Sequence, residues 1–238
     1  MKLRSTFGIL LKAVFALIFI SLIAGCGGKD KRPIVFFGDS LTSGVGAAPQ
    51  ESYPKVIESK VSLTVINAGI AGDTAKDAIQ RVERDVLKHN PQMVIVFLGA
   101  NDVFGLGNVA AVNAHLSALG DDLGNILTAV KATDRQVFLV NTFGSSDRPA
   151  ADAQSLHSAL KRMNLFTDDS PEDFLAMLLA HGKMMEELAR SKSVGFIDNV
   201  WRGVINVEGN MSPDGIHPNA DGYKVMAENI FAQIKSHL

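Results

Sequence analysis

Five short apolar runs constrain the fold of this chain more than any other feature of its sequence. Each run has the length of a strand, and most are rich in Val, Ile and Phe without the strict alternation of a half-exposed strand. Strands of this kind are typical of parallel sheets, because helices cover such sheets on both faces. The runs are residues 33–38, 63–67, 93–99, 136–141 and 194–198.

Helical patterns lie between these runs. Apolar residues recur at spacings of three and four after Asp73, along 110–131 and after Pro218, and Asp73 is a candidate N-cap. Ser170 followed by Pro171 predicts the start of a further helix. Strands that alternate with helices predict a single α/β domain, a three-layer α/β/α sandwich of about five parallel strands.

The connection before the fifth run is unusually long. Its first part, residues 142–169, shows neither a sustained strand nor a clear helix cap. Long connections in compact domains usually serve a function or are mobile. Two interpretations stay open for this segment: a lid or acyl-binding flap over a site, or a short helix packed on the body of the domain.

The N-terminal residues have the pattern of an export signal. Lys2 and Arg4 precede an apolar run over 13–24, which is too short to span a bilayer comfortably. The sequence that follows, Ile-Ala-Gly-Cys ending at Cys26, resembles the lipobox of bacterial lipoproteins, in which the cysteine thiol carries diacylglycerol. We therefore expect a signal peptide over 1–25, a lipidated tether over 26–32 and a folded domain over 33–238. The alternative is a plain signal peptide in which the cysteine is incidental.

Composition limits the classes of function. Cys26 is the only cysteine, so the fold has no intramolecular disulfide. The formal net charge is −2, and it becomes more negative when the basic residues of the first 25 positions are removed. With no block of like charges, this balance argues against a nucleic-acid partner. Any membrane attachment is expected to be through the lipid on Cys26.

Polar clusters follow the first three runs and the fifth. They occupy residues 38–41, 67–73, 99–102 and 214–218. In open parallel sheets, ligands bind at the carboxyl ends of the strands, so these four clusters should converge on one site.

The four clusters could supply each group that ester hydrolysis needs. Ser40 would be the nucleophile, His217 its base, and Asp214 the group that orients the imidazole. The backbone N–H groups of Ser40 and Gly72 and the side-chain amide of Asn101 would form the oxyanion hole. Each residue has a simpler interpretation when taken alone, as a strand-ending turn, a helix cap, a tight turn or a surface histidine. Their order and their positions at strand ends favour a single catalytic site.

These clusters resemble the conserved blocks of the SGNH hydrolases, also called the GDSL esterase/lipase family. The resemblance rests on Gly38-Asp39-Ser40-Leu41, on Gly72, on Asn101 in Gly-x-Asn-Asp, and on Asp214 and His217 in Asp-x-x-His. It implies a flavodoxin-like fold, a Ser40 acyl-enzyme, and catalysis without a metal or other cofactor. The chain is particularly similar to the bacterial periplasmic thioesterase/lysophospholipase and arylesterase branch. It differs from that branch in its apparent lipid anchor and its longer connection before the fifth strand.

Two rival hydrolase classes fit the sequence less well. The α/β-hydrolases share the order Ser, Asp, His, but their nucleophile elbow is Gly-x-Ser-x-Gly, and Thr42 stands at the last position here. A metal hydrolase is disfavoured because the other five histidines show no ligand-like pairing, and we expect most of them on solvent-facing helix surfaces. These histidines are His89, His115, His157, His181 and His237.

The sequence therefore predicts a serine hydrolase that acts on small acyl esters, with lysophospholipids and acyl thioesters among the candidate substrates. Two alternatives remain: a carbohydrate or peptidoglycan O-acetyl esterase, and a catalytically silent envelope-binding lipoprotein. We expect a monomer held at the membrane of a bacterial cell envelope by its N-terminal lipid. Gly27, in place of Asp after Cys26, favours the periplasmic face of the outer membrane in a Gram-negative host.

Overall fold

All five predicted strands are present in the computed structural model, which describes residues 31–143, 150–166 and 170–238. They form one parallel sheet in the order β2-β1-β3-β4-β5. The strands are β1 (Ile34–Gly38), β2 (Val65–Gly69), β3 (Met93–Phe97), β4 (Gln136–Val140) and β5 (Gly195–Ile197).

The strands lack strict alternation because both faces of the sheet are buried. In β1, Val35 and Phe37 belong to one hydrophobic cluster, whereas Ile34 and Phe36 belong to the cluster on the opposite face. All four side chains are completely buried. A strand of this kind needs an apolar residue at every position, which explains the pattern in the sequence.

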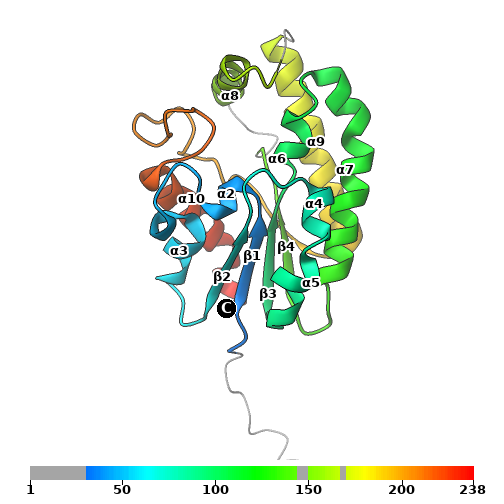
Figure 1. Ribbon diagram of the computed structural model, residues 1–238, viewed down its shortest axis with the longest axis vertical. Coiled ribbons are helices and arrows are strands. Elements are labelled where there is room, and N and C mark those ends of the chain that lie inside the picture. The colour runs from blue at the N-terminus through cyan, green and yellow to red at the C-terminus, as the bar shows by residue number, and fades with distance from the viewer. Residues whose placement is uncertain (1–30, 144–149, 167–169) are drawn as a thin grey trace, which may run out of the picture. The chain divides into compact units, whose positions relative to one another are not determined.

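Helices form the two outer layers (Figure 1). The helices α4, α5, α7 and α9 cover one face, and α3 and α10 cover the other. The predicted three-layer α/β/α sandwich is therefore confirmed for the unit that spans Arg32–Leu238. The bounds of these helices are α3 (Tyr53–Glu58), α4 (Ala75–Ile79), α5 (Val82–Asp85), α7 (Val109–Val130), α9 (Pro171–Lys192) and α10 (Ala220–Ile234).

Several shorter elements occur in the connections and after α10. They are α2 (Ser40–Ser43), α6 (Ala100–Phe104) and the 3-10 turns η1 (Pro49–Glu51), η2 (Leu87–His89) and η3 (Lys235–His237). Among the described residues, no helix has the length and hydropathy that crossing a membrane would require.

The helix caps agree with the sequence at one predicted position and differ at another. Ser170 caps α9 and Pro171 is its first residue, as predicted. The prediction that Asp73 is an N-cap is wrong, because Thr74 caps α4 and its hydroxyl accepts a hydrogen bond from the Asp77 N–H. The carboxylate of Asp73 instead accepts a hydrogen bond from the side chain of Arg81. The expected continuous helix is also divided into α4, α5 and η2.

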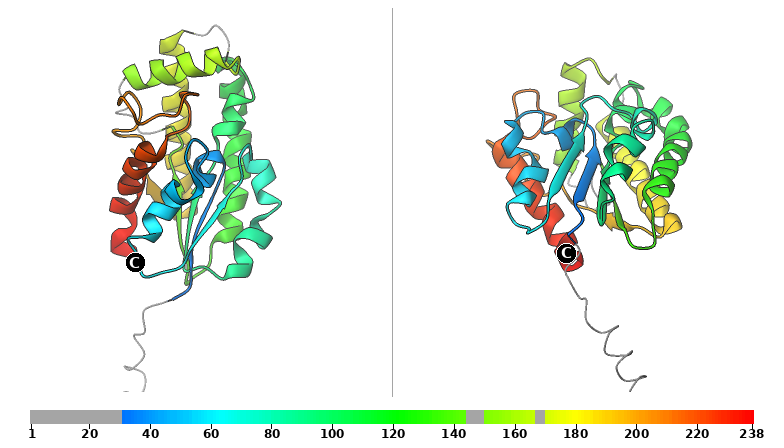
Figure 2. Two further views of the ribbon diagram at one scale, coloured as in Figure 1. Left: turned by 60° about the vertical axis from the view of Figure 1, so that its left-hand side comes forward. Right: turned by 60° about the horizontal axis from the view of Figure 1, so that its bottom comes forward.

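The long connection before β5 contains a helix, α8 (Ala150–Arg162). Ala153, Leu156, Ala159 and Leu160 are buried, and α8 packs against α9. Figures 1 and 2 show α8 beyond the carboxyl ends of the strands. The interpretation of this segment as a helix packed on the body therefore holds for 150–162, while residues 144–149 and 167–169 lie outside the described part of the chain.

The strand order determines where a ligand can bind. The chain passes from β1 to β2 on one side and then returns to β3 on the other side of β1. This reversal creates a crevice at the carboxyl ends of β1 and β3, which is the usual ligand site of the flavodoxin-like order 2-1-3-4-5. The polar clusters at 38–41 and 99–102 follow these two strands directly.

Candidate active site

The backbone places Ser40 immediately beyond the end of β1. A Cβ atom at Gly38 would lie 2.0 Å from Thr42 Oγ1 and 2.6 Å from the Phe97 carbonyl oxygen, so only glycine fits there. Asp39 Oδ1 accepts a hydrogen bond of 3.0 Å from the N–H of Leu41 and thereby caps α2. Ser40 is the first residue of that short helix, and its side chain lines a pocket.

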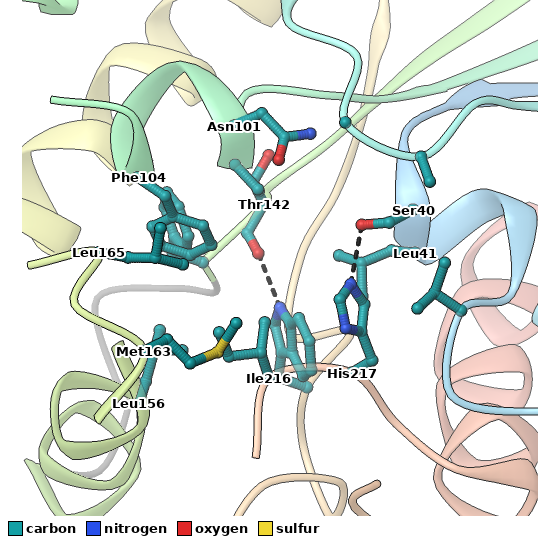
Figure 3. A pocket seen from close by; sticks show the side chains of 16 residues that line it. Ser40, Leu41, Asn101, Phe104, Thr142, Leu156, Met163, Leu165, Ile216 and His217 are labelled. Atoms are coloured by element: carbon teal, nitrogen blue, oxygen red, sulfur yellow. Dashed lines mark hydrogen bonds between the residues drawn. The ribbon is translucent and has the colours of Figure 1, made fainter. Parts of the chain in front are cut away.

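Ser40, His217 and Asp214 form one chain of hydrogen bonds. The distance from Ser40 Oγ to His217 Nε2 is 2.9 Å, and the distance from His217 Nδ1 to Asp214 Oδ2 is 2.7 Å. Figure 3 shows the first of these contacts at the edge of the pocket. This is the arrangement of nucleophile, base and orienting carboxylate that defines a serine hydrolase triad.

The second oxygen of Asp214 fixes the loop that carries His217. Oδ1 accepts hydrogen bonds from the N–H groups of Ile216 and His217 and from the Ser212 hydroxyl, at 2.8, 2.9 and 2.8 Å. Burial raises the pKa of Asp214, but hydrogen bonds from the His217 ring and from these other donors outweigh burial and lower the pKa to about 2. The carboxylate therefore stays ionised and can stabilise a positive imidazolium.

The three expected oxyanion donors lie around the same pocket. Gly72 lines it with φ +88°, in the left-handed region, and a Cβ atom there would contact no protein atom within 4 Å. The positive φ, and not a lack of room, therefore favours glycine at 72. The space beside its Cα atom is part of the pocket. Asn101 Nδ2 donates one hydrogen bond to the Asp73 carbonyl oxygen, at 2.8 Å. Figure 3 shows this amide nitrogen turned toward the side where Ser40 lies.

Comparison with known proteins decides the family. The model of the GDSL-like Lipase/Acylhydrolase family matches residues 36–225 of this chain, a range that includes Ser40, Gly72, Asn101, Asp214 and His217. The chain belongs to this family. Membership confirms the resemblance that the sequence showed and identifies the protein as a carboxylic ester hydrolase.

Sequence identity to individual relatives is low or covers only part of the chain. "Uncharacterized lipoprotein YqeF" from Bacillus subtilis is 35% identical over 97 residues, which cover 37% of this chain and only 39% of YqeF. "Thioesterase 1/protease 1/lysophospholipase L1" from Escherichia coli K12 is 26% identical over 204 residues, 85% of this chain and 83% of that protein. The crystal structure of a lipase/acylhydrolase from Enterococcus faecalis aligns with a TM-score of 0.59 and 25% identity, over 87% of this chain and 97% of that one.

The pocket of this GDSL hydrolase is mostly apolar. It has a volume of about 280 Å³ and extends from Ser40 and His217 toward α6 and α8. Figure 3 shows Phe104, Leu156, Met163 and Leu165 on the side opposite Ser40. The apolar side chains that line it are Leu41, Val45, Ala71, Ala100, Phe104, Phe143, Leu156, Met163, Leu165, Trp201 and Ile216.

Two of the other five histidines are exceptions to the expectation that most of them face solvent. His181 is completely buried, packs edge-on against the ring of Phe143 at 4.8 Å, and has no hydrogen-bond partner for either ring nitrogen among the described residues. Burial lowers the pKa of His181 to about 3. His157 is also buried, stacked on Phe174. Both lie on faces of α8 and α9 that pack into the core, which helix periodicity could have indicated.

One residue near the site was missed from the sequence. Arg81 is 6% exposed, and its guanidinium bonds to Asp73 and to carbonyl oxygens at the ends of β1 and β2. The available signal was its position, because Arg81 falls three residues after buried Ala78, on the apolar face of the helical pattern. An arginine on such a face has to be paired, since a buried charge without a partner is very costly.

Proposed function

We propose that this GDSL hydrolase cleaves esters with apolar acyl groups through an acyl-enzyme on Ser40. The observation that carries the proposal is the continuous hydrogen-bond chain from Ser40 through His217 to Asp214, at 2.9 and 2.7 Å, beside an apolar pocket. The roles follow from the chemistry of each group, with Ser40 as nucleophile, His217 as general base and acid, and Asp214 as the orienting carboxylate.

In the acylation step, Ser40 Oγ attacks the carbonyl carbon of the ester while His217 Nε2 takes its proton. Asp214 holds the proton on Nδ1 and so keeps Nε2 free to accept. The negative charge that develops on the carbonyl oxygen is stabilised by the N–H groups of Ser40 and Gly72 and by the Asn101 amide. When the tetrahedral intermediate collapses, the C–O or C–S bond breaks and His217 gives its proton to the leaving alcohol or thiol.

In the deacylation step, the same groups act on water. His217 takes a proton from water, the hydroxide attacks the acyl carbon, and the oxyanion is stabilised as before. Collapse releases a carboxylic acid and returns the proton to Ser40 Oγ. All of these proton transfers use side chains of this chain, so neither a metal nor a cofactor enters the proposed cycle.

The pocket supports a substrate with an acyl chain longer than acetyl. Each methylene buried in an apolar site contributes about 0.8 kcal/mol, and the side chains opposite Ser40 are apolar. An acetyl group would leave most of this surface without contact. The E. coli relative named as a thioesterase and lysophospholipase makes acyl thioesters and lysophospholipids the first substrates to test.

We also propose that the mature protein is a lipid-anchored monomer in a bacterial cell envelope, with residues 1–25 removed, 26–32 as tether and 33–238 as catalytic domain. The lipobox at Cys26 supports the anchor, and the relative YqeF is named a lipoprotein. With Gly27 after the cysteine, the proposed location in a Gram-negative host is the periplasmic face of the outer membrane.

Ser40→Ala tests the mechanism. We expect this variant to lose hydrolysis of p-nitrophenyl butyrate by at least a thousandfold while it keeps its far-UV circular dichroism, because the nucleophile is removed and the fold is not. Ser59→Ala, which changes an exposed serine at the end of α3, is the matched control and should be as active as wild type. A fluorophosphonate probe should label wild type but not Ser40→Ala. Undiminished turnover by Ser40→Ala would refute the mechanism.

A further inference from the structure

Arg81 is bonded to the two chain segments that carry the Ser40 and Gly72 donors, and Asp73 connects it to the third proposed oxyanion donor, Asn101. We propose that Arg81 is a positioning residue, which holds these donors in the geometry that stabilises the transition state. This inference rests on the proposed function and adds to it a residue that does not touch the substrate. Arg81 lies in the turn between α4 and α5 and does not line the pocket.

The guanidinium uses all three of its nitrogens. Nη2 donates to the carbonyl oxygen of Gly38 at 2.9 Å, Nη1 donates to that of Ala68 at 2.8 Å, and Nε donates to Asp73 Oδ2 at 2.5 Å. Nη1 also lies 3.2 Å from Asp85 Oδ2. The guanidinium group stacks over the ring of Phe37, 4.4 Å from its centre. A planar, rigid guanidinium can donate hydrogen bonds to several acceptors on different sides at once. A lysine ammonium, which has a single nitrogen, cannot replace it.

Two of these contacts, those to Gly38 and Asp73, connect Arg81 to the three oxyanion donors. Gly38 lies two residues before Ser40, whose N–H is the first donor. Asp73 follows Gly72, whose N–H is the second donor, and the carbonyl oxygen of Asp73 accepts the hydrogen bond from Asn101, the third donor. Arg81 therefore joins β1, β2 and the 70–74 loop at the point where the three donors must converge.

Convergence of this kind matters for the rate more than for substrate binding. Oxyanion donors act on charge that appears only in the transition state, and a displacement of about 1 Å can cost on the order of a hundredfold in rate. The apolar wall of the pocket opposite Ser40 comes from elements that Arg81 does not contact, α6, α8 and the turn after α8. A loss of Arg81 should consequently lower kcat and leave KM nearly unchanged.

The test compares Arg81→Met with Arg84→Met in hydrolysis of p-nitrophenyl butyrate. Arg84 is three residues away, its side chain is 64% exposed, and it pairs with the same Asp85, so it is a matched control for the loss of one positive charge. We expect Arg81→Met to lower kcat by about ten- to a hundredfold with less than a threefold change in KM, and Arg84→Met to change neither by more than about twofold. Arg81→Lys should recover little of the lost rate.

A double-mutant cycle separates positioning from general stability. If Arg81 acts through the oxyanion hole, Asn101→Ala should cost much less in the Arg81→Met background than in wild type. Affinity for a trifluoromethyl ketone, whose adduct with serine carries an oxyanion, should fall by the same factor as kcat/KM. Multiplicative effects of the two substitutions would overturn the proposal, and so would a loss confined to KM.

Asp73→Asn keeps the test decisive if Arg81→Met does not fold, because it weakens one contact and retains the shape of the side chain. It should lower kcat several-fold without changing KM, and an unchanged kcat would overturn the proposal.

Wild type and Ser40→Ala are measured in parallel. An inactive wild type, or an active Ser40→Ala, would refute the proposed function itself, whereas an active wild type with an unaffected Arg81→Met would refute only the role of Arg81.

Discussion

Two carboxylates near Ser40 have opposite surroundings and therefore opposite charge behaviour. Asp214 is partly exposed and receives four hydrogen bonds, which bring its pKa to about 2. Asp39 is completely buried, receives one hydrogen bond at Oδ1, and has no partner for Oδ2 among the described residues. Burial raises the pKa of Asp39 to about 7, with further repulsion from Asp102 and Asp73. Asp39, next to Ser40, therefore changes its charge near pH 7, whereas Asp214 stays ionised.

This difference predicts how Asp39 affects stability as pH changes. Between about pH 4 and pH 7, native Asp39 holds a proton that the unfolded chain has released, so the free energy of unfolding falls as pH rises through this window. Asp39→Asn removes the titration and retains an oxygen for the Leu41 N–H. We expect the variant to gain on the order of 2 kcal/mol relative to wild type between pH 5 and pH 8 in urea unfolding.

The control for this measurement is Asp121→Asn, an exposed aspartate on α7, whose difference from wild type should be small and similar at both pH values. An equal stability difference between Asp39→Asn and wild type at pH 5 and pH 8 would show that Asp39 does not titrate in this range.

The elements of the fold differed in how well the sequence predicted them. Strands such as β1 were recognisable because every side chain is buried, which leaves a continuous apolar run. In contrast, α8 was not located, since its buried positions include small alanines such as Ala153 and Ala159 and the rest of the helix is polar. The capping role of Asp73 was also mispredicted, because its carboxylate accepts a hydrogen bond from Arg81, eight residues later.

One element bears on the proposed preference for longer acyl chains, namely α8 together with the turn that follows it. Leu156, Met163 and Leu165 come from this segment and line the pocket opposite Ser40 (Figure 3). The same helix exposes Gln154 on another face, where it lines a separate groove. The long connection before β5 therefore supplies one wall of the pocket beside Ser40.

Leu165→Trp should shorten the preferred acyl chain. The larger side chain would occupy space that the distal methylenes of an acyl group need, and loss of two buried methylenes corresponds to about 1.6 kcal/mol. We expect the ratio of kcat/KM for p-nitrophenyl octanoate over acetate to fall by about tenfold. Gln154→Trp carries the same change outside the pocket and should leave the ratio unaltered. An unchanged ratio in Leu165→Trp would remove this segment from the acyl site.

For the unit over residues 32–238, one topological fact accounts for most of what the sequence could predict about the site. Parallel strands deliver their carboxyl ends to one edge, so Ser40 and Asn101 had to lie near each other once β1 and β3 were recognised as neighbours in such a sheet. The Asp214–His217 loop lies further along the chain after β5. It was identified from its Asp-x-x-His motif, because the spacing of apolar residues does not indicate it. The helical pattern could have placed Arg81 on a buried face, but the partners of Arg81 and the pocket wall from α8 depend on side-chain packing between distant elements, which no local pattern encodes.

The anchor proposed for the whole protein can be tested independently of catalysis. Diacylglycerol supplies two acyl chains, which is enough for stable membrane binding, whereas a single chain is marginal. Cys26→Ser removes the thiol that would carry the lipid, and the residue lies outside the unit Arg32–Leu238 that holds the site. In a bacterial host that processes lipoproteins, wild type should partition into the detergent phase of Triton X-114 and incorporate labelled palmitate. Cys26→Ser should do neither, yet hydrolyse p-nitrophenyl butyrate with the kcat/KM of wild type.

Ser21→Ala, which leaves the lipobox intact, should behave as wild type. Unlabelled wild type in the aqueous phase would show that Cys26 is not lipidated and that the cysteine at the end of the export signal is incidental.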